Sequence, residues 1–150
     1  ASANALWAKL DAAGLVTEDA VAAAGEAALR QCGLSRQKIR YAQALALARL
    51  DYAALRTTPT DDVIALLVAL PGIGRWTAEI YAMFSLGRAD IFAPGDLALQ
   101  EAARLLLDLP ARPSERELRA ISEAWSPWRS VAARALWAYY RVAKAREGSR

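Results

Sequence analysis

The chain has 150 residues, 55% of them hydrophobic, and a formal net charge of +3, so it suits one domain with a substantial core and permits nucleic-acid binding without requiring it. Because it contains no histidine, a histidine general base, a Ser-His-Asp triad and a histidine-based metal site are excluded. Its single cysteine, Cys32, excludes a four-cysteine iron–sulfur cluster and an internal disulfide, so catalysis must rest on carboxylate, lysine, tyrosine or backbone groups.

Helical signals recur along the chain, and no segment alternates apolar and polar residues as a half-buried strand does. The expected helices cover residues 3–13, 17–31, 35–50, 61–69, 75–86, 96–109, 114–125 and 126–146, with a short turn at 51–55. The expected N-caps are Thr17, Ser35, Thr60 and Ser114, the last in a capping box with Glu117. The longest apolar run, at 63–70, is far too short to span a membrane. The sequence therefore predicts an all-α domain of about eight short helices.

Two glycines mark a tight turn between the helices expected at 61–69 and 75–86. The segment reads Leu70-Pro71-Gly72-Ile73-Gly74-Arg75. Glycine lacks a Cβ, so the backbone there can turn sharply or come close to another molecule. The free N–H groups of such a turn, opening into a helix N-terminus, form an anion site that suits a phosphate. The alternative interpretation is an ordinary Pro-Gly loop between two helices.

A single carboxylate follows on the next loop, in the segment Pro94-Gly95-Asp96. Asp is among the most favoured N-cap residues, so this position alone predicts only the start of a helix. Together, a phosphate-binding turn and one acid at the mouth of the next helix suggest an enzyme that acts on DNA.

The order Leu-Pro-Gly-Ile-Gly, with a helix on each side and Thr77-Ala78 after it, resembles the hairpin of the helix-hairpin-helix DNA glycosylase superfamily. The resemblance covers nearly the whole chain and includes Pro94-Gly95-Asp96 and the segment 125–137. It implies that the hairpin backbone binds DNA phosphates while one apolar side chain, Ile73, fills the core. The implied backbone-binding residues are Gly72, Ile73, Gly74 and Arg75. It also allows a monovalent cation on the carbonyls of Leu70 and Gly72, and implies no metal held by side chains.

The same resemblance implies that Asp96 is the catalytic carboxylate. Breaking an N-glycosidic bond builds positive charge on the deoxyribose, and a fixed anion beside the sugar stabilises that oxocarbenium-like state. The carboxylate can also orient or deprotonate the attacking water. Capping and catalysis are compatible roles for this residue.

Trp76 stands where superfamily members that also nick the DNA backbone carry the lysine that forms a Schiff base with the sugar. The chain's lysines are Lys9, Lys38 and Lys144, none of them near the hairpin in the sequence. This favours a monofunctional glycosylase over a bifunctional glycosylase/lyase.

The segments 74–78 and 125–130 are most similar to the alkylpurine branch, the 3-methyladenine DNA glycosylase II type. In that branch a tryptophan at the place of Trp137 lines the base pocket. An electron-rich indole attracts a cationic alkylated purine more than a normal base. Trp76 and Tyr81 are further candidates for the same pocket.

Four further residues have a structural interpretation. Trp125 and Trp128 are expected to pack in the core because apolar residues recur there near helical spacing. Arg129 is expected to be a structural arginine at the edge of the core and not a DNA contact. Cys32 is expected to be a small buried apolar residue.

The predicted function is that of a monofunctional DNA glycosylase of base excision repair. It would hydrolyse the N-glycosidic bond of alkylated purines, 3-methyladenine and 7-methylguanine, in double-stranded DNA and without a cofactor. A monomer acting on nucleoid DNA in a bacterial cytoplasm, with no membrane contact, is expected. Because family members carry further N-terminal structure, residues 1–150 are expected to form a glycosylase domain that is incomplete at its N-terminus. The alternative is a non-catalytic helix-hairpin-helix DNA-binding module or an inactive fragment.

Overall fold

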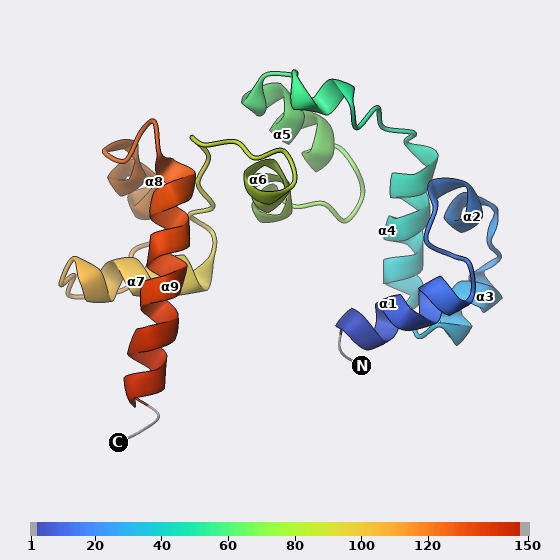
Figure 1. Ribbon diagram of the computed structural model, residues 1–150, viewed down its shortest axis with the longest axis horizontal. Helices are drawn as coiled ribbons and strands as arrows, with labels where there is room; N and C mark the ends of the chain where they lie inside the picture. The colour runs from blue at the N-terminus through green and yellow to red at the C-terminus, as the bar shows by residue number, and fades with distance from the viewer. Residues whose placement is uncertain (1–2, 148–150) are drawn as a thin grey trace. The chain divides into compact units, whose positions relative to one another are not determined.

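The computed structural model describes residues 3–147, whose helices are shown in Figure 1. Within this range the chain forms nine α-helices, one 3-10 helix and no strand, so the predicted all-α fold is confirmed. The elements are α1 (Ala3–Ala12), α2 (Glu18–Ala23), α3 (Glu26–Gln31), α4 (Arg36–Leu47), the 3-10 helix η1 (Ala54–Arg56), α5 (Thr60–Val68), α6 (Arg75–Phe84), α7 (Leu97–Leu106), α8 (Glu115–Glu123) and α9 (Arg129–Glu147). None of the described helices has both the length and the hydropathy needed to cross a bilayer.

The contacts divide the chain into two compact units. The first unit consists of Ala1–Thr57 and Ala65–Gly74, and the second of Thr58–Ile64 and Arg75–Arg150. Helix α5 therefore begins in the second unit and ends in the first. The glycine turn belongs to the first unit, and the Asp96 loop belongs to the second.

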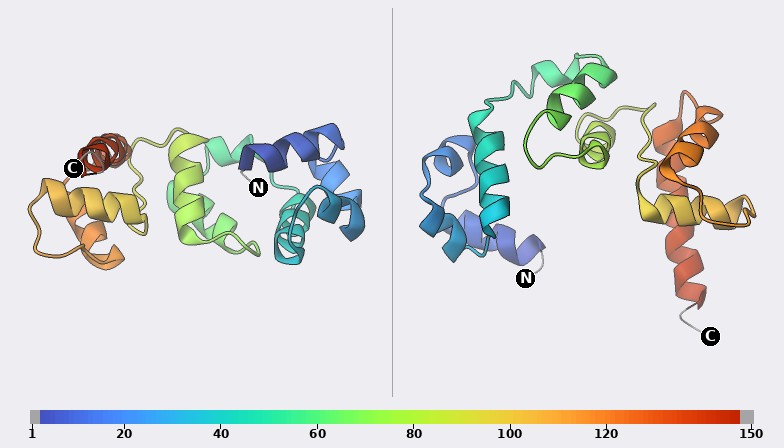
Figure 2. Two further views of the ribbon diagram at one scale, coloured as in Figure 1. Left: turned by 90° about the horizontal axis from the view of Figure 1, so that it is seen from below. Right: turned by 180° about the vertical axis from the view of Figure 1, so that it is seen from behind.

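In the first unit, α4 packs against α2 and α3, which lie beside it in Figures 1 and 2. Leu29, Ile39 and Ala46 are buried, and so is Cys32, as predicted. Helix α4 begins after Ser35, whose Oγ accepts a hydrogen bond from the Lys38 backbone N–H at 3.3 Å. The predicted N-cap at Ser35 is therefore confirmed.

The single helix predicted over 17–31 is wrong, because the chain leaves the helical conformation between α2 and α3. Thr17 caps α2 as predicted, but Ala24 is extended, with φ −68° and ψ 134°, and Gly25 follows. Glycine is a poor helix former, and the Ala24 carbonyl accepts a hydrogen bond from Gln43 Nε2 at 3.0 Å. The Gln43 side chain, from α4, thus stabilises the break between α2 and α3. The sequence around residues 24 and 25 does not indicate this contact.

In the second unit, α7 packs against both α8 and α9, and Figure 1 shows α9 lying across α7. Its buried core consists of Met83, Phe92, Ala93, Leu99, Ala102, Ala103, Leu118, Ala133 and Leu136. The ring of Trp125 packs on this core, 5.3 Å from the Phe92 ring, as predicted. Trp128 is 62% exposed, so the prediction that it packs in the core is wrong. Trp128 lies just before the first turn of α9. Helical spacing predicts which residues share a face, but not which part of that face is covered by other elements.

Several helix ends differ from the predicted ones for local reasons. Helix α7 ends at Leu106 because Leu107 caps it and Asp108 adopts a left-handed φ of 51°. Thr60 is the first residue of α5 and not its N-cap, since the Pro59 carbonyl already accepts from Val63. Such shifts of one turn or less are the usual error of sequence-based helix ends.

Candidate active site

Asp96 caps helix α7 from the end of a buried loop. Its Oδ1 accepts hydrogen bonds from the backbone N–H groups of Ala98 at 2.9 Å and Leu99 at 3.0 Å. The loop before it is held by Gln100, a buried side chain whose Nε2 donates to the Pro94 carbonyl at 2.8 Å. These contacts fix the carboxylate on a rigid support, and the predicted N-cap at Asp96 is confirmed.

Two tryptophan side chains donate to the same carboxylate. Trp76 Nε1, from the first turn of α6, lies 3.1 Å from Asp96 Oδ2, and Trp137 Nε1, from α9, lies 3.2 Å from Asp96 Oδ1. Three residues singled out in the sequence thus meet at one point, although 41 positions separate Asp96 from Trp137. The side-chain donors come from α6 and α9 and the backbone donors from α7, so the position of the carboxylate depends on how these three helices pack.

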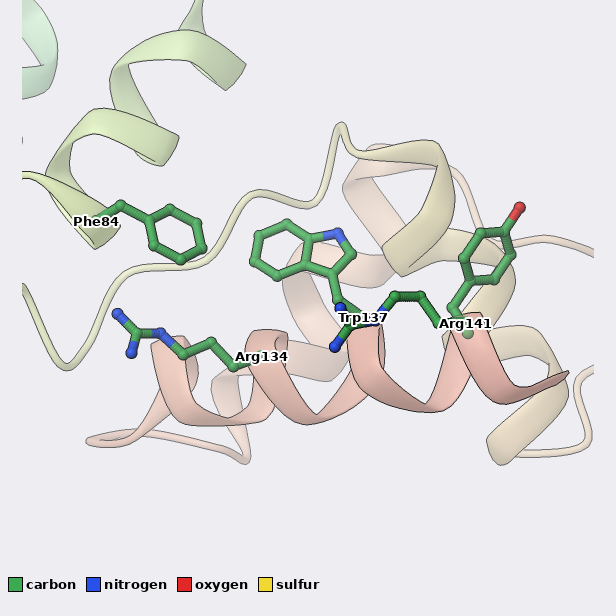
Figure 3. Close-up of a pocket in the computed structure, with 5 residues that line it drawn as sticks. Phe84, Arg134, Trp137 and Arg141 are labelled. Carbon is green, nitrogen blue, oxygen red and sulfur yellow. The ribbon is translucent and has the colours of Figure 1, made fainter. Parts of the chain in front are cut away.

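A pocket of about 420 Å³ lies on the side of Trp137 (Figure 3). It is lined by Phe84, Arg134, Trp137, Tyr140 and Arg141. The Phe84 and Trp137 rings are 5.7 Å apart and tilted by 32°, and the Arg134 guanidinium lies 5.0 Å from the centre of the Phe84 ring. The structure therefore brings together aromatic faces and positive charge beside the carboxylate.

Tyr81, the third candidate for a base pocket, is half-buried on α6 and does not line this pocket. It lies five residues after Trp76, which is about 140° around a helix, whereas Phe84 is eight residues on, about 80° from Trp76. A role of Tyr81 in base binding remains a prediction.

The two glycines of the hairpin have different environments. Gly72 has φ +85°, and a Cβ there would lie 2.2 Å from Cγ of Tyr41 on α4, so both conformation and packing require glycine. Gly74 has no such φ, and apart from its own atoms and its two chain neighbours no heavy atom lies within 4 Å of the position of its Cβ. The fold leaves Gly74 open to the solvent, and this suits close approach by another molecule. Ile73 between them is half-buried, and its N–H donates to the Leu70 carbonyl at 3.2 Å.

Arg75 is part of an ion-pair network that the sequence analysis did not identify. Its Nε lies 3.0 Å from Oε1 of Glu79, a side chain only 1% exposed, and Arg119 Nη2 from α8 lies 3.1 Å from the same oxygen. Burial raises the pKa of Glu79, while the two guanidinium groups act against that rise. The i, i+4 spacing of Arg75 and Glu79 is a signal for the first pair, but nothing in the sequence indicates Arg119. The Arg75 side chain stays half exposed and is therefore accessible to DNA. Its contact with DNA remains a prediction.

Arg129 has the structural role predicted for it. Its Nε and Nη2 donate to Asp90 at 2.6 and 3.0 Å, and Ser126 Oγ donates to the same carboxylate at 2.8 Å. The guanidinium holds the pKa of the Asp90 carboxyl below its ordinary value, with the serine contributing. This pair fastens the start of α9 to the loop that leads to Asp96.

No group of three His, Cys, Asp or Glu side chains in the described part of the chain could hold a metal ion. A monovalent cation at the hairpin would instead use backbone carbonyls. The Leu70 carbonyl accepts one hydrogen bond, from Ile73, and a carbonyl oxygen has two lone pairs, so it could also bind such a cation. The cation stays a prediction.

Among known proteins, this chain is similar to enzymes named for 3-methyladenine. It is 32% identical over 120 residues to DNA-3-methyladenine glycosylase 1 of Schizosaccharomyces pombe, covering 77% of this chain and 53% of that protein. It is 32% identical over 123 residues to DNA-3-methyladenine glycosylase 2 of Escherichia coli, covering 81% of this chain and 41% of that protein. The chain thus spans about half the length of these curated relatives.

Solved structures and a family model agree with these relatives. The Schizosaccharomyces pombe 3-methyladenine DNA glycosylase in complex with abasic DNA superposes with a TM-score of 0.78 at 29% identity, over 89% of this chain and 69% of that one. The DNA-3-methyladenine glycosidase of Bacillus halodurans gives 0.81 at 33% identity, over 91% and 66%. The family model of HhH-GPD superfamily base excision DNA repair proteins matches residues 1–127. The chain belongs to the HhH-GPD superfamily of base excision DNA repair proteins.

Proposed function

We propose that this chain is the catalytic domain of a monofunctional DNA glycosylase, which hydrolyses the N-glycosidic bond of alkylated purines, 3-methyladenine and 7-methylguanine, in duplex DNA. The observation that carries the proposal is the Asp96 carboxylate, which is held by a helix N-terminus and by the indole N–H groups of Trp76 and Trp137. The names of the relatives support the substrate class.

The two oxygens of Asp96 have different tasks in this proposal. Oδ1 accepts three hydrogen bonds, from two backbone amides and Trp137, and anchors the side chain. Oδ2 accepts only from Trp76 among the described residues, so it is the oxygen left to face the sugar. A fixed negative charge there stabilises the oxocarbenium-like transition state, and the same oxygen orients the water that attacks it.

The damaged nucleotide must leave the duplex before its sugar can reach this carboxylate. Trp137 lines the pocket beside Asp96, and its ring offers a stacking surface for the extruded base. The hairpin supplies the grip on the duplex through backbone N–H groups, and Gly74 leaves room for a phosphate to come close. These roles use the chain's own residues and require no cofactor.

The test is the replacement of Asp96 by asparagine, with excision measured on duplex DNA carrying one alkylated purine. Asparagine can still cap α7, so the Asp96→Asn variant is expected to fold and bind DNA but to excise about 10²–10³-fold more slowly. The matched control is Asp62→Asn, the same change at an exposed position in the first turn of α5. An Asp96→Asn rate within a few-fold of the unmodified chain would overturn the assignment. Duplex binding by the unmodified chain without any excision would favour the non-catalytic DNA-binding module.

A further inference from the structure

Two arginines border the pocket beside the proposed catalytic carboxylate. Arg134 and Arg141 are seven residues apart on α9, which is two helical turns, and Trp137 lies between them on the same face (Figure 3). Neither arginine forms an ion pair with another side chain in the described part of the chain. Their positive charges are therefore not neutralised by a partner that a ligand would have to displace.

The aromatic wall of the pocket already carries a cation. The Arg134 guanidinium lies over the Phe84 ring at 5.0 Å, and the Lys144 ammonium lies over the Tyr140 ring at 5.9 Å. The negative face of an aromatic ring is the feature that attracts a cationic base. Of the three aromatic rings that line the pocket, two already have a face occupied by a cationic side chain of the protein itself.

The charges around the pocket do not favour another cation. Arg134 and Arg141 line it, Lys144 lies against its Tyr140 wall, and the Asp96 carboxylate beyond Trp137 is the opposing charge. A purine methylated at N7 carries a positive charge in DNA, whereas deaminated adenine, which is hypoxanthine, is neutral. Two unit charges a few ångströms apart at a partly exposed site interact strongly enough to change affinity several-fold.

We propose that Arg134 and Arg141 are specificity-determining residues, which make this pocket prefer neutral damaged purines, such as hypoxanthine, over cationic alkylated ones. This inference rests on the proposed function, because it assumes that the pocket receives the extruded base. The arginines act on base binding, while Asp96 acts on bond cleavage. Cationic bases remain substrates, since their glycosidic bonds are weakened by the charge itself, but they enter against repulsion.

The experiment compares two duplexes of the same sequence, one with 7-methylguanine and one with hypoxanthine at the same position. Replacing either arginine by methionine keeps much of the apolar stem and removes the charge. Each of Arg134→Met and Arg141→Met is expected to raise kcat/KM for 7-methylguanine relative to hypoxanthine by about 3- to 10-fold. Arg134→Lys, which keeps the charge, is expected to keep the ratio of the unmodified chain. Arg116→Met on α8 is the matched control, because this exposed arginine does not line the pocket.

An unchanged ratio in the double variant would overturn the proposal, and so would an equal shift in Arg116→Met. Equal loss for both lesions would mean that the arginines bind phosphates and do not select the base. A second measurement does not depend on catalysis: quenching of tryptophan fluorescence by free inosine and by 7-methylguanosine at mildly acidic pH. Tighter binding of inosine, with this preference lost in the double variant, supports the proposal even if no base is excised. The absence of excision would refute only the proposed function. Equal binding of the two nucleosides, or none of either, would overturn it.

Discussion

At the scale of single residues, the indole N–H of Trp76 is the contact most open to a clean test. It is the only described donor to Asp96 Oδ2, the oxygen that faces the sugar in our proposal. Trp76→Phe keeps an aromatic ring but removes this hydrogen bond to a charged group, so excision is expected to slow by about tenfold or more, with duplex affinity nearly unchanged. Single-turnover excision measures this. Trp128→Phe, at an exposed site, is the control, and equal rates for both variants would show that the donor to Oδ2 is dispensable.

The hairpin glycines give a matched pair of predictions because only one of them is needed by the fold. Gly72→Ala places a Cβ against the Tyr41 ring at a positive φ, so it is expected to lower the free energy of unfolding by about 1–3 kcal/mol. Gly74→Ala meets no atom and is expected to leave stability within about 0.5 kcal/mol while weakening duplex binding. Urea unfolding and fluorescence anisotropy at fixed salt separate the two effects. Unchanged duplex binding by Gly74→Ala would reduce the turn to an ordinary loop.

At the scale of helices and loops, the Asp90–Arg129 pair makes stability depend on pH. Its hydrogen bonds lower the pKa of Asp90 in the folded chain. A carboxyl with a lowered folded pKa stabilises the fold at neutral pH, and this contribution is lost as the pH falls below about 4 and through the lowered value. Arg129→Met is therefore expected to cost about 1 kcal/mol at neutral pH and progressively less in acid. Urea unfolding of the unmodified chain and of Arg129→Met, at neutral pH and at a pH below about 4, measures this cost. An equal cost at the two pH values would contradict the predicted pH dependence.

Glu79 joins α6 to α8 from a buried position, between Arg75 and Arg119. Removing the carboxylate in Glu79→Leu takes away the shared partner of two partly exposed guanidinium groups, so we expect a loss of about 1.5–3 kcal/mol. Glu115→Gln removes only the exposed partner of Arg119 and is expected to cost less than about 1 kcal/mol. Thermal or urea unfolding of both variants provides the comparison. Similar losses in the two would mean that burial of Glu79 adds nothing to the network.

Local chemistry accounts for the parts of these elements that the sequence predicted. Thr17, Ser35, Asp96 and Ser114 all cap helices, because an N-cap side chain bonds backbone groups only a few residues away. The break at Gly25 and the pairing of Glu79 with Arg119 depend on side chains brought in from another helix. The convergence on Asp96 could be inferred only by resemblance, since helical spacing shows which residues share a face and not which faces meet.

At the scale of the whole molecule, the three lysines decide whether strand cleavage is available. Lys9 and Lys38 belong to the first unit, and the Lys144 ammonium lies 5.9 Å from the centre of the Tyr140 ring. With Trp76 on the first turn of α6, no amine is expected to form a Schiff base, so the product should be an intact abasic strand that borohydride does not trap on the protein.

Gel analysis of the borohydride reaction tests this, with the N-terminal amine blocked as a control because any free α-amine attacks an abasic sugar weakly. A strong adduct that survives blocking but disappears in Lys144→Arg would identify Lys144 as a lyase residue. The proposed glycosylase would then be bifunctional.

Asp96 is both the cap of α7 and the proposed catalyst. The residue spacing along α7 therefore fixes the proposed active site and the core together. Leu99, Ala102 and Ala103 enter the core at fixed angles counted from that cap. One residue inserted after Asp96 would turn every later side chain of α7 by about 100° and move this apolar face out of the core. Evolution can therefore change the site by substitution, but not by inserting or deleting a residue at this point. The spacing from Asp96 to Leu99 is expected to be the same in all relatives, even in those whose pocket residues have diverged.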